Sequence, residues 1–222
     1  MNIPGELLNS YILWFAWVPW LLLIMGAIYL APWRRFTNST HLNLYLGMLV
    51  TLALIWRLQA GVEAGLSLHL LGAALLMLSF GTQLAFVGLN LILLFVIISN
   101  GDGMASFAIN ALLMGGLSIG ITYLAWLLID RYLPNNLFVY LFGLGFFASG
   151  LSILCVGICS TLLLSLSGAY NWAHLSEYYL PYFVLLSFAE GWLTGMVTTL
   201  LVVYFPGWMA TFNDNKYLRR TS

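Results

Sequence analysis

Seven long apolar runs alternate with short polar segments along the chain. A hydrocarbon layer about 30 Å thick is crossed by about 20 helical residues at 1.5 Å each. The segments between the runs have turn-forming sequences, such as Asn100-Gly101-Asp102-Gly103. The pattern predicts seven membrane-crossing helices, at residues 11–31, 43–56, 68–80, 84–99, 108–129, 138–167 and 180–205.

The third of these predicted helices differs from the others. Residues 68–80 form a short run that is interrupted by Gly72 and followed by Gly81. Short segments broken by glycine at membrane depth are places where irregular backbone lines a site instead of facing lipid. We therefore expect this part of the chain to lie near any functional site.

Composition places the chain in a lipid bilayer. Hydrophobic residues make up 62% of its 222 residues and charged residues only 6%, whereas a soluble domain carries about 25% charged residues. So few charges exclude a soluble enzyme and a disordered chain, and nucleic-acid binding is excluded because it requires a basic face. No linker is long enough to separate domains. We expect an all-α polytopic membrane bundle, formed as a single transmembrane domain over residues 1–222.

The basic residues predict the orientation in the membrane. With seven crossings, one side of the membrane receives Arg57 and the other receives six basic residues, namely Arg34, Arg35, Arg131, Lys216, Arg219 and Arg220. Cytoplasmic loops carry the excess of Lys and Arg. We therefore predict an outside N-terminus and a cytoplasmic tail at residues 207–222. The start has neither a basic n-region nor a cleavage site, so we expect the mature chain to keep Met1.

The sequence lacks the common motifs of catalytic and nucleotide-binding sites. It contains no P-loop, no G-x-S-x-G, no H-E-x-x-H and no dinucleotide fingerprint, so we predict that the protein is not an enzyme. Any ATP hydrolysis would belong to another chain. Cys155 and Cys159, four residues apart in an apolar run, are interpreted as small hydrophobic residues.

Two polar residues in apolar surroundings are candidates for function. Glu190 lies about halfway along its predicted helix, where a carboxylate must face a partner inside the bundle. It either caps a hydrogen-bond network that fixes helix packing or belongs to a binding site or relay. His69 is either a structural histidine with its hydrogen bonds satisfied or a metal ligand, since imidazole is a common one.

Four motifs in order along the chain resemble one known family. The start, Met1-Asn2-Ile3-Pro4-Gly5-Glu6, is similar to the M-H-I-P-E-G opening of the CbiM/NikM family. Residues 65–81 resemble that family's G-x-S-x-H-x-x-G segment. Residues 100–115 resemble its H-G-G loop and the following G-A-N helix, and Ala189-Glu190-Gly191 its A-E-G. Members of this family are the substrate-binding membrane components of energy-coupling-factor importers for cobalt and nickel.

The resemblance implies a fold, a site and partners. It implies that residues 1–10 fold back into the bundle and that the terminal amine, the next backbone nitrogen and histidine side chains hold the metal. Carried over to this sequence, the ligands are Met1, Asn2 and His69. Supporting residues would be Asn100, Asp102, Asn110 and Glu190. The substrate would be a divalent ion of nickel, cobalt or copper, because planar nitrogen ligands suit such ions. Separate ATPase subunits and a transmembrane coupling subunit would be the partners, in a bacterial inner membrane.

Two departures from the family pattern keep other hypotheses open. Asn2 stands where the family has its first imidazole, and Asn100 stands where it has a histidine before two glycines. A carboxamide oxygen is a much poorer ligand for these metals than imidazole. The chain is therefore a metal-uptake component, a relative that has lost metal binding and takes another small solute, or a structural or regulatory membrane protein.

Overall fold

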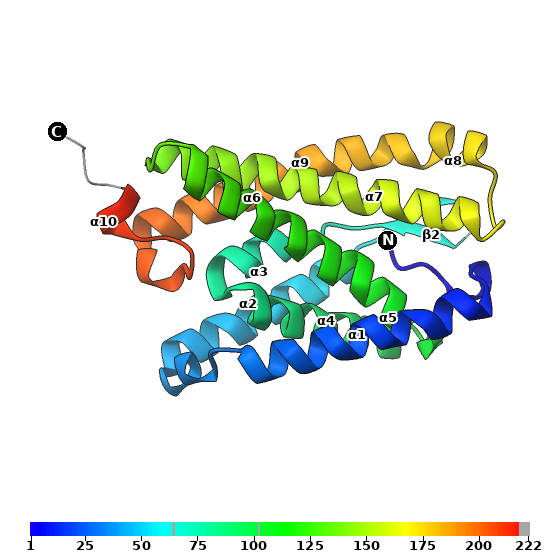
Figure 1. Ribbon diagram of the computed structural model, residues 1–222, viewed down its shortest axis with the longest axis horizontal. Helices are drawn as coiled ribbons and strands as arrows, with labels where there is room; N and C mark the ends of the chain where they lie inside the picture. Colours follow the sequence, from blue (N-terminus) through cyan, green and yellow to red (C-terminus); the bar gives the residue numbers. More distant parts are fainter. Residues whose placement is uncertain (64, 102, 218–222) are drawn as a thin grey trace.

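The computed structural model describes residues 1–63, 65–101 and 103–217. In this part of the chain, six helical stretches are long and apolar enough to cross a membrane. They run side by side in one bundle (Figure 1). Their bounds are Ser10–Leu30, Ser39–Arg57, Thr82–Asn100, Met104–Tyr132, Val139–Leu166 and Trp172–Tyr204. The predicted all-α membrane bundle is confirmed.

Three of these stretches are single helices and three are composite. The single ones are α1 (Ser10–Leu30), α2 (Ser39–Arg57) and α4 (Thr82–Asn100). The others include wide π-helical turns at η4 (Ala111–Leu117) and η5 (Val139–Ala148). Their remaining parts are η3 (Met104–Ser106), α5 (Phe107–Asn110), α6 (Ser118–Tyr132), α7 (Ser149–Leu166), α8 (Trp172–Tyr178) and α9 (Leu180–Tyr204).

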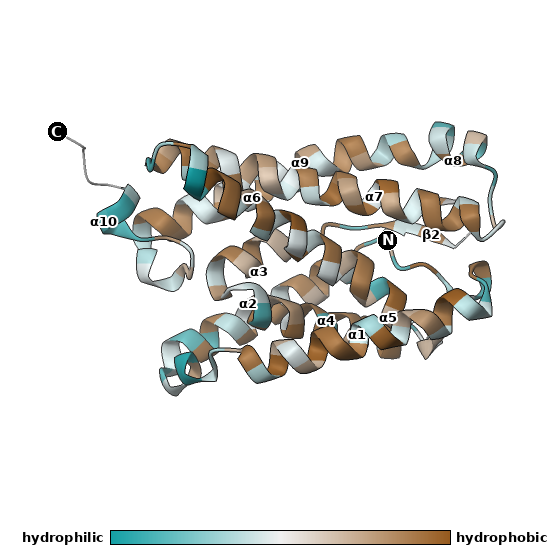
Figure 2. Ribbon diagram, viewed as in Figure 1, coloured by the Kyte–Doolittle hydropathy of each residue, from teal (hydrophilic) through white to brown (hydrophobic). Residues whose placement is uncertain are grey.

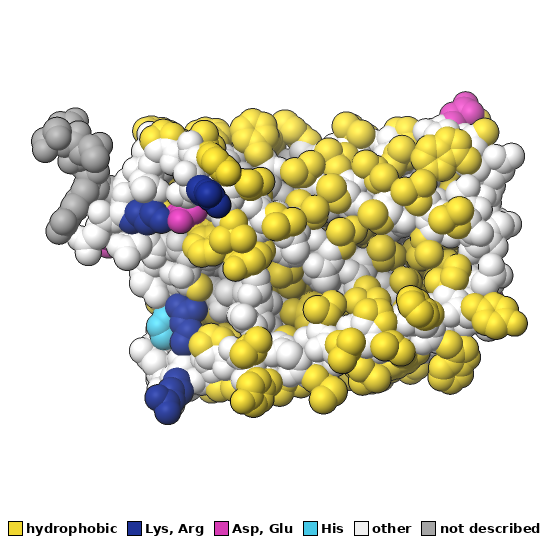
Figure 3. All heavy atoms as spheres, viewed as in Figure 1, with side chains coloured by type: hydrophobic (Ala, Val, Ile, Leu, Met, Phe, Trp, Pro, Cys, Tyr) yellow, Lys and Arg dark blue, Asp and Glu magenta, His cyan; other side chains and the backbone are white. Residues whose placement is uncertain are grey.

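Large apolar side chains cover the outside of the bundle. Trp14, Phe147 and Leu185 are each more than 60% exposed, and Figure 3 shows such side chains over most of the visible face. Hydrophilic residues gather at the two ends, as Figure 2 shows. A helix that is apolar all round is stable only when lipid or protein surrounds it. The apolar surface between two polar ends is therefore the lipid-facing surface.

The structure differs from the prediction at the third helix. Residues 68–80 do not form one helix. The segment begins at Leu68, the last residue of a short antiparallel hairpin of β1 (Ala60–Glu63) and β2 (Leu66–Leu68). An irregular link leads from it to α3 (Ala73–Phe80), which has only eight residues and so spans about 12 Å. Gly72 and Gly81 bound α3 with φ of +67° and +88°, a backbone conformation that favours glycine and ends a helix. Within the part of the chain that the structure describes, six long helical stretches thus replace the seven predicted helices.

The polypeptide still passes from end to end of the bundle at this point. In Figure 1 α2 runs toward the hairpin, α3 lies between the hairpin and the opposite end, and α4 runs back. The first residues of α1 and the C-terminal helix α10 (Asp214–Tyr217) consequently lie at opposite ends. Arg34 and Arg35, in η2 (Trp33–Thr37), share the α10 end. Which end faces the cytoplasm stays a prediction.

Glycines let α9 pack closely on η5 and α7. A Cβ at Gly145 would lie 3.2 Å from the Cα of Gly195, and one at Gly157 would lie 2.3 Å from Phe183. Small residues of this kind allow helix backbones to approach closely in membranes. The last crossing is thereby held against the one before it.

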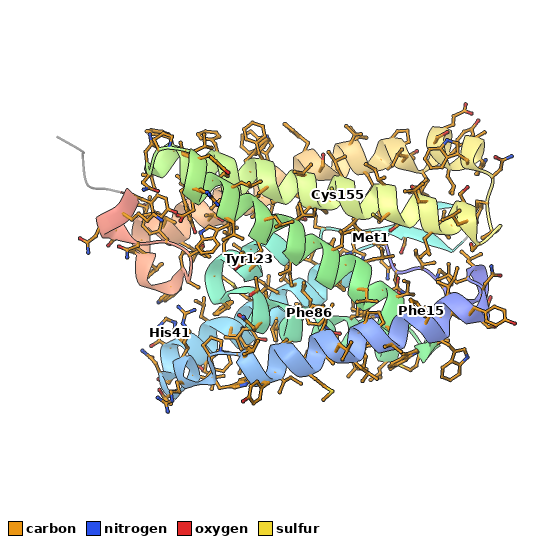
Figure 4. The ribbon with its side chains drawn as sticks, in the orientation of Figure 1. Met1, Phe15, His41, Phe86, Tyr123 and Cys155 are labelled. Carbon is orange, nitrogen blue, oxygen red and sulfur yellow. The ribbon has the colours of Figure 1, made fainter. Side chains whose placement is uncertain are left out.

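The segment before α1 folds into the bundle. Met1 and Ile3 are 2% and 1% exposed, and only a short turn, η1 (Gly5–Leu7), separates them from α1. Figure 4 shows Met1 between the helices, well away from both ends. This return of the chain brings Met1 beside Ser67 of β2.

Candidate metal site

The amine of Met1 is buried and neutral at pH 7. It donates a hydrogen bond to Oγ of Ser67 in β2 at 3.4 Å. Burial lowers the pKa of this amine from 8.0 to about 4, because a charged ammonium would lose its hydration. A neutral amine keeps its lone pair, which is the form that binds a metal ion.

Asn110 fixes the two residues that follow Met1. Its Oδ1 accepts from the backbone N–H of Ile3 at 2.9 Å, and its Nδ2 donates to the carbonyl of Ile3 at 2.9 Å. The same Nδ2 also donates to Oδ1 of Asn2 at 2.6 Å. Asn110 is fully buried at the end of α5, just before the π-helical turn η4. One carboxamide thus pairs with the backbone as a neighbouring strand would, and holds the chain terminus in place.

His69 lies in the irregular link after β2, with its ring against Trp56 of α2. The ring centroids are 4.7 Å apart, and Nε1 of Trp56 donates to the carbonyl of Leu71 at 3.0 Å. Nδ1 of His69 contacts the carbonyl of Leu70 at 3.1 Å. A carbonyl only accepts, so Nδ1 carries the proton and Nε2 keeps its lone pair. Fixing one nitrogen in this way orients the other for a ligand.

Electrostatics links His69 to the chain terminus. The pKa of His69 is lowered from 6.5 to about 3, first by burial and then by the positive charge that the Met1 amine would carry. The Met1 amine also donates to Ser67, two residues before His69. The amine and the imidazole are therefore both buried in the region around the end of β2.

Glu190 supports this region from α9. Its two carboxylate oxygens accept the backbone N–H groups of Leu71 and Gly72 at 2.9 and 2.7 Å. Gly72 itself is pressed against Leu52, since a Cβ there would lie 2.2 Å from that side chain. Of the two interpretations of Glu190, the hydrogen-bond network is the one whose partners the structure supplies. The carboxylate fixes the backbone just after His69.

A cavity of about 650 Å³ adjoins the site at the end of the bundle near the hairpin. Its polar lining includes Asn2 and Ser67, which adjoin Met1, together with Gln59 and Asn100. Most of its rim comes from the N-terminal segment and from the loop after α4. Asp102, the remaining predicted supporting residue, lies outside the described residues. The cavity offers polar groups and room for water next to Asn2 and Ser67.

Two residues at the site carry weak sequence signals. Ser67 belongs to the G-x-S-x-H pattern but gives no sign that its hydroxyl would meet the chain terminus. Trp56 resembles any tryptophan at the end of an apolar run. Its contact with His69 depends on the hairpin that returns the chain toward α2.

The donors at this site are nitrogen atoms of the backbone and one imidazole. No cluster of three or more His, Cys, Asp or Glu side chains suited to a metal occurs within residues 1–63, 65–101 and 103–217. The nitrogen atoms that the sequence predicts as ligands are the Met1 amine, the Asn2 amide nitrogen and Nε2 of His69, and their role as ligands stays a prediction. An amine and the next amide nitrogen close a five-membered chelate ring around an ion, and such nitrogen sets suit nickel and copper.

Comparison with known proteins gives a consistent family match. Residues 2–208 match the model of the CbiM family, described as the cobalt uptake substrate-specific transmembrane region. The crystal structure of a truncated transition metal transporter superposes with a TM-score of 0.79 at 16% identity, covering 92% of this chain and 99% of that one. A second transition metal transporter gives 0.75 at 16% identity, with 90% and 92% covered. No curated protein sequence matches the chain.

Proposed function

The chain belongs to the CbiM family, and we propose that it binds the substrate metal ion in an importer of the energy-coupling-factor type. The observation that carries the proposal is that the buried Met1 amine donates a hydrogen bond to Ser67, two residues before His69, which is also buried. The substrate is a divalent transition metal ion, with nickel and copper best suited to nitrogen ligands and cobalt less so. The role requires a mature chain that begins at Met1, which N-terminal sequencing would establish.

The proposed partners follow from what the chain lacks. Its sequence has no nucleotide-binding motif, so separate ATPase subunits supply the energy and a transmembrane coupling subunit transmits it. The lipid-facing surface described above is consistent with a multi-pass protein of the bacterial inner membrane. In this arrangement the end with Arg34 and Arg35 faces the cytoplasm.

Metal binding by the purified full-length chain tests the proposal. We expect nickel(II) to bind in equilibrium dialysis at one ion per chain, and the affinity to fall at least about 100-fold in His69→Ala. His69→Phe keeps an aromatic ring against Trp56 and should lose binding equally. His41→Ala, at the opposite end of the bundle, is the matched control and should bind normally (Figure 4). Equal, negligible binding of nickel, cobalt and copper in all four proteins would refute the proposal.

A second function is favoured by one contact. Asn2 occupies the position of the family's first imidazole, and its Oδ1 is already engaged by Asn110 at 2.6 Å. A chain that no longer binds metal would fit this arrangement and could hold another small solute in the 650 Å³ cavity. The dialysis experiment separates the two functions, because only the first gives a His69-dependent loss of bound metal.

A further inference from the structure

Both ends of the buried helix α3 are held by α9 and the segment that follows it. Before α3 begins, Glu190 accepts the N–H groups of Leu71 and Gly72. Where α3 ends, the N–H groups of Ala210 and Thr211 donate to the carbonyls of Ser79 and Leu78 at 3.0 and 3.2 Å. The hydroxyl of Thr211 donates to the same Leu78 carbonyl at 3.0 Å. We call Glu190, Ala210 and Thr211 the α3 clamp.

These contacts fix where α3 lies. A helix of eight residues is too short to be stable alone. Its terminal N–H and C=O groups lack intrahelical partners, and leaving such a group buried without one destabilises the fold. The α3 clamp satisfies groups at both ends. Any displacement of α9 must therefore either break these hydrogen bonds or carry α3 with it.

α3 lies on the path from the site to the end of the bundle that bears α10. All eight of its residues are buried, and it packs against α4, α6, α7 and α9. Met1 lies on one side of it along the bundle axis and α10 on the other (Figures 1 and 4). α3 therefore lies between the Met1 region and the α10 end of the bundle.

Glycines link α3 to its neighbours on both sides. Gly72 and Gly81 have φ of +67° and +88°, and Gly72 follows His69 by three residues. Glycine tolerates changes of backbone conformation that other residues resist. When α3 shifts, it can therefore rotate about these two glycines, and the same movement would displace His69.

The clamp continues to the surface of the bundle. Residues 209–217 pack through Met209, Phe212 and Tyr217, which are buried, and Tyr217 stacks on Phe212 at 5.2 Å. Lys216 pairs with Asp130 of α6. Asn213, Asp214 and Asn215 are exposed at this end. A protein that binds at this end of the bundle would contact a segment whose backbone is hydrogen-bonded directly to α3.

We propose that α9, residues 209–211 and α3 move as one unit that opens the exit for the metal ion. A coupling subunit that displaces the segment after α9 shifts α3 through Ala210 and Thr211, and shifts His69 through Glu190. The ion is then released toward the α10 end. Glu190 and Thr211 are positioning residues that act on the ligand His69 from the two ends of α3. This inference rests on the proposed function, whose ligands it uses.

Hydrogen exchange of the purified full-length chain tests the coupling without metal. We expect Thr211→Val to speed the exchange of the Leu71 and Gly72 amides about tenfold, although they lie at the far end of α3. Glu190→Gln should likewise speed the exchange of the Ala210 and Thr211 amides. Thr51→Val removes a comparable hydroxyl-to-carbonyl bond at an exposed position of α2 and should change neither pair. Effects confined to the mutated end of α3 would overturn the proposal.

The rate of metal release tests the proposal at the level of function. Nickel(II) should dissociate about tenfold faster from Thr211→Val than from the wild type or Thr51→Val, since coupling between sites typically changes affinity by such factors. An unchanged dissociation rate would also overturn the proposal. If the wild type binds no metal, the proposed function fails, whereas the exchange experiment still reports whether the two ends of α3 are coupled. The two failures are thereby distinguished.

Discussion

α1 and α3 are both runs of apolar residues, but their surroundings are opposite. In α1, with 21 residues, only Ala16 and Ala27 are buried, whereas all eight residues of α3 are buried. Lipid solvates the side chains of α1, while protein surrounds α3 on every side. The difference teaches that an apolar run reports only an apolar environment. It does not tell whether that environment is lipid or the interior of the bundle.

The polar groups that could bind a metal lie inside the bundle, in surroundings like those of α3. Backbone that is irregular, at residues 1–4 and 69–72, can exist at membrane depth only where other groups satisfy its hydrogen bonds. Asn110 does so for Ile3, and Glu190 does so for Leu71 and Gly72. The same irregular segments contain backbone nitrogen atoms that, in a regular helix, would donate hydrogen bonds to carbonyl groups of that helix.

The most direct test of this difference in surroundings is a matched pair of side-chain truncations, one in α3 and one in α1. Leu76 of α3 is fully buried and Leu22 of α1 is 69% exposed. Leu76→Ala should lower the free energy of unfolding by about 2–5 kcal/mol, because protein leaves a cavity behind. Leu22→Ala should cost less than about 0.5 kcal/mol, because detergent or lipid fills the space. Denaturant unfolding in micelles would measure both, and equal costs would contradict the assignment of α3 to the protein interior.

An extension of the chain by one residue before Met1 tests the buried terminus. It turns the amine into an amide and displaces the new amine from the pocket beside Ser67. We expect nickel(II) affinity to fall at least about 100-fold in equilibrium dialysis. The matched control is a one-residue extension after Ser222, which should bind as the wild type does. Unchanged binding by the N-terminally extended chain would rule out the amine as a ligand.

Asn2→His should sharpen the site by restoring the imidazole that the family has at this position. We expect nickel(II) affinity to rise about tenfold, because imidazole is a better ligand than a carboxamide. Asn2→Ala removes the contact with Asn110 without adding a ligand and should bind no better than the wild type. Equal affinities of the His and Ala variants would show that residue 2 does not face the metal.

The smallest expected effect is the pH dependence of the metal-free protein. The pKa of the Met1 amine is 8.0 in the unfolded reference and about 4 in the folded protein. Between these values the unfolded chain takes up a proton that the folded chain does not, so stability falls as pH falls. From pH 8 to pH 7 the loss from this group should be about 1 kcal/mol. Thermal unfolding at both pH values would measure it.

The N-terminally extended chain is the control for this dependence. Its amine should lie in water both before and after unfolding, so this contribution should vanish between pH 7 and pH 8. An undiminished dependence in the extended chain would assign the effect to another group.

Most long helices were predictable because length and hydropathy are local properties. The predicted helix at residues 11–31 became Ser10–Leu30, and that at residues 180–205 became Leu180–Tyr204. The third helix was not predictable in the same way. Residues 68–80 are apolar enough for a helix, but Leu68 belongs to β2, residues 69–72 form an irregular link that ends at the left-handed Gly72, and only residues 73–80 are helical.

The sequence by itself determined a lipid-embedded helical bundle, its family motifs and the residue types that can meet a metal. These follow from local composition and spacing, because each apolar run carries its own preference for lipid. Only the tertiary structure decided that Met1, Ser67 and His69 share one buried region and that α9 and the segment after it hold the two ends of α3. Those contacts join residues such as Ile3 and Asn110, or Leu78 and Thr211, which are 107 and 133 positions apart. No local pattern encodes such pairs, since they depend on how the helices pack together.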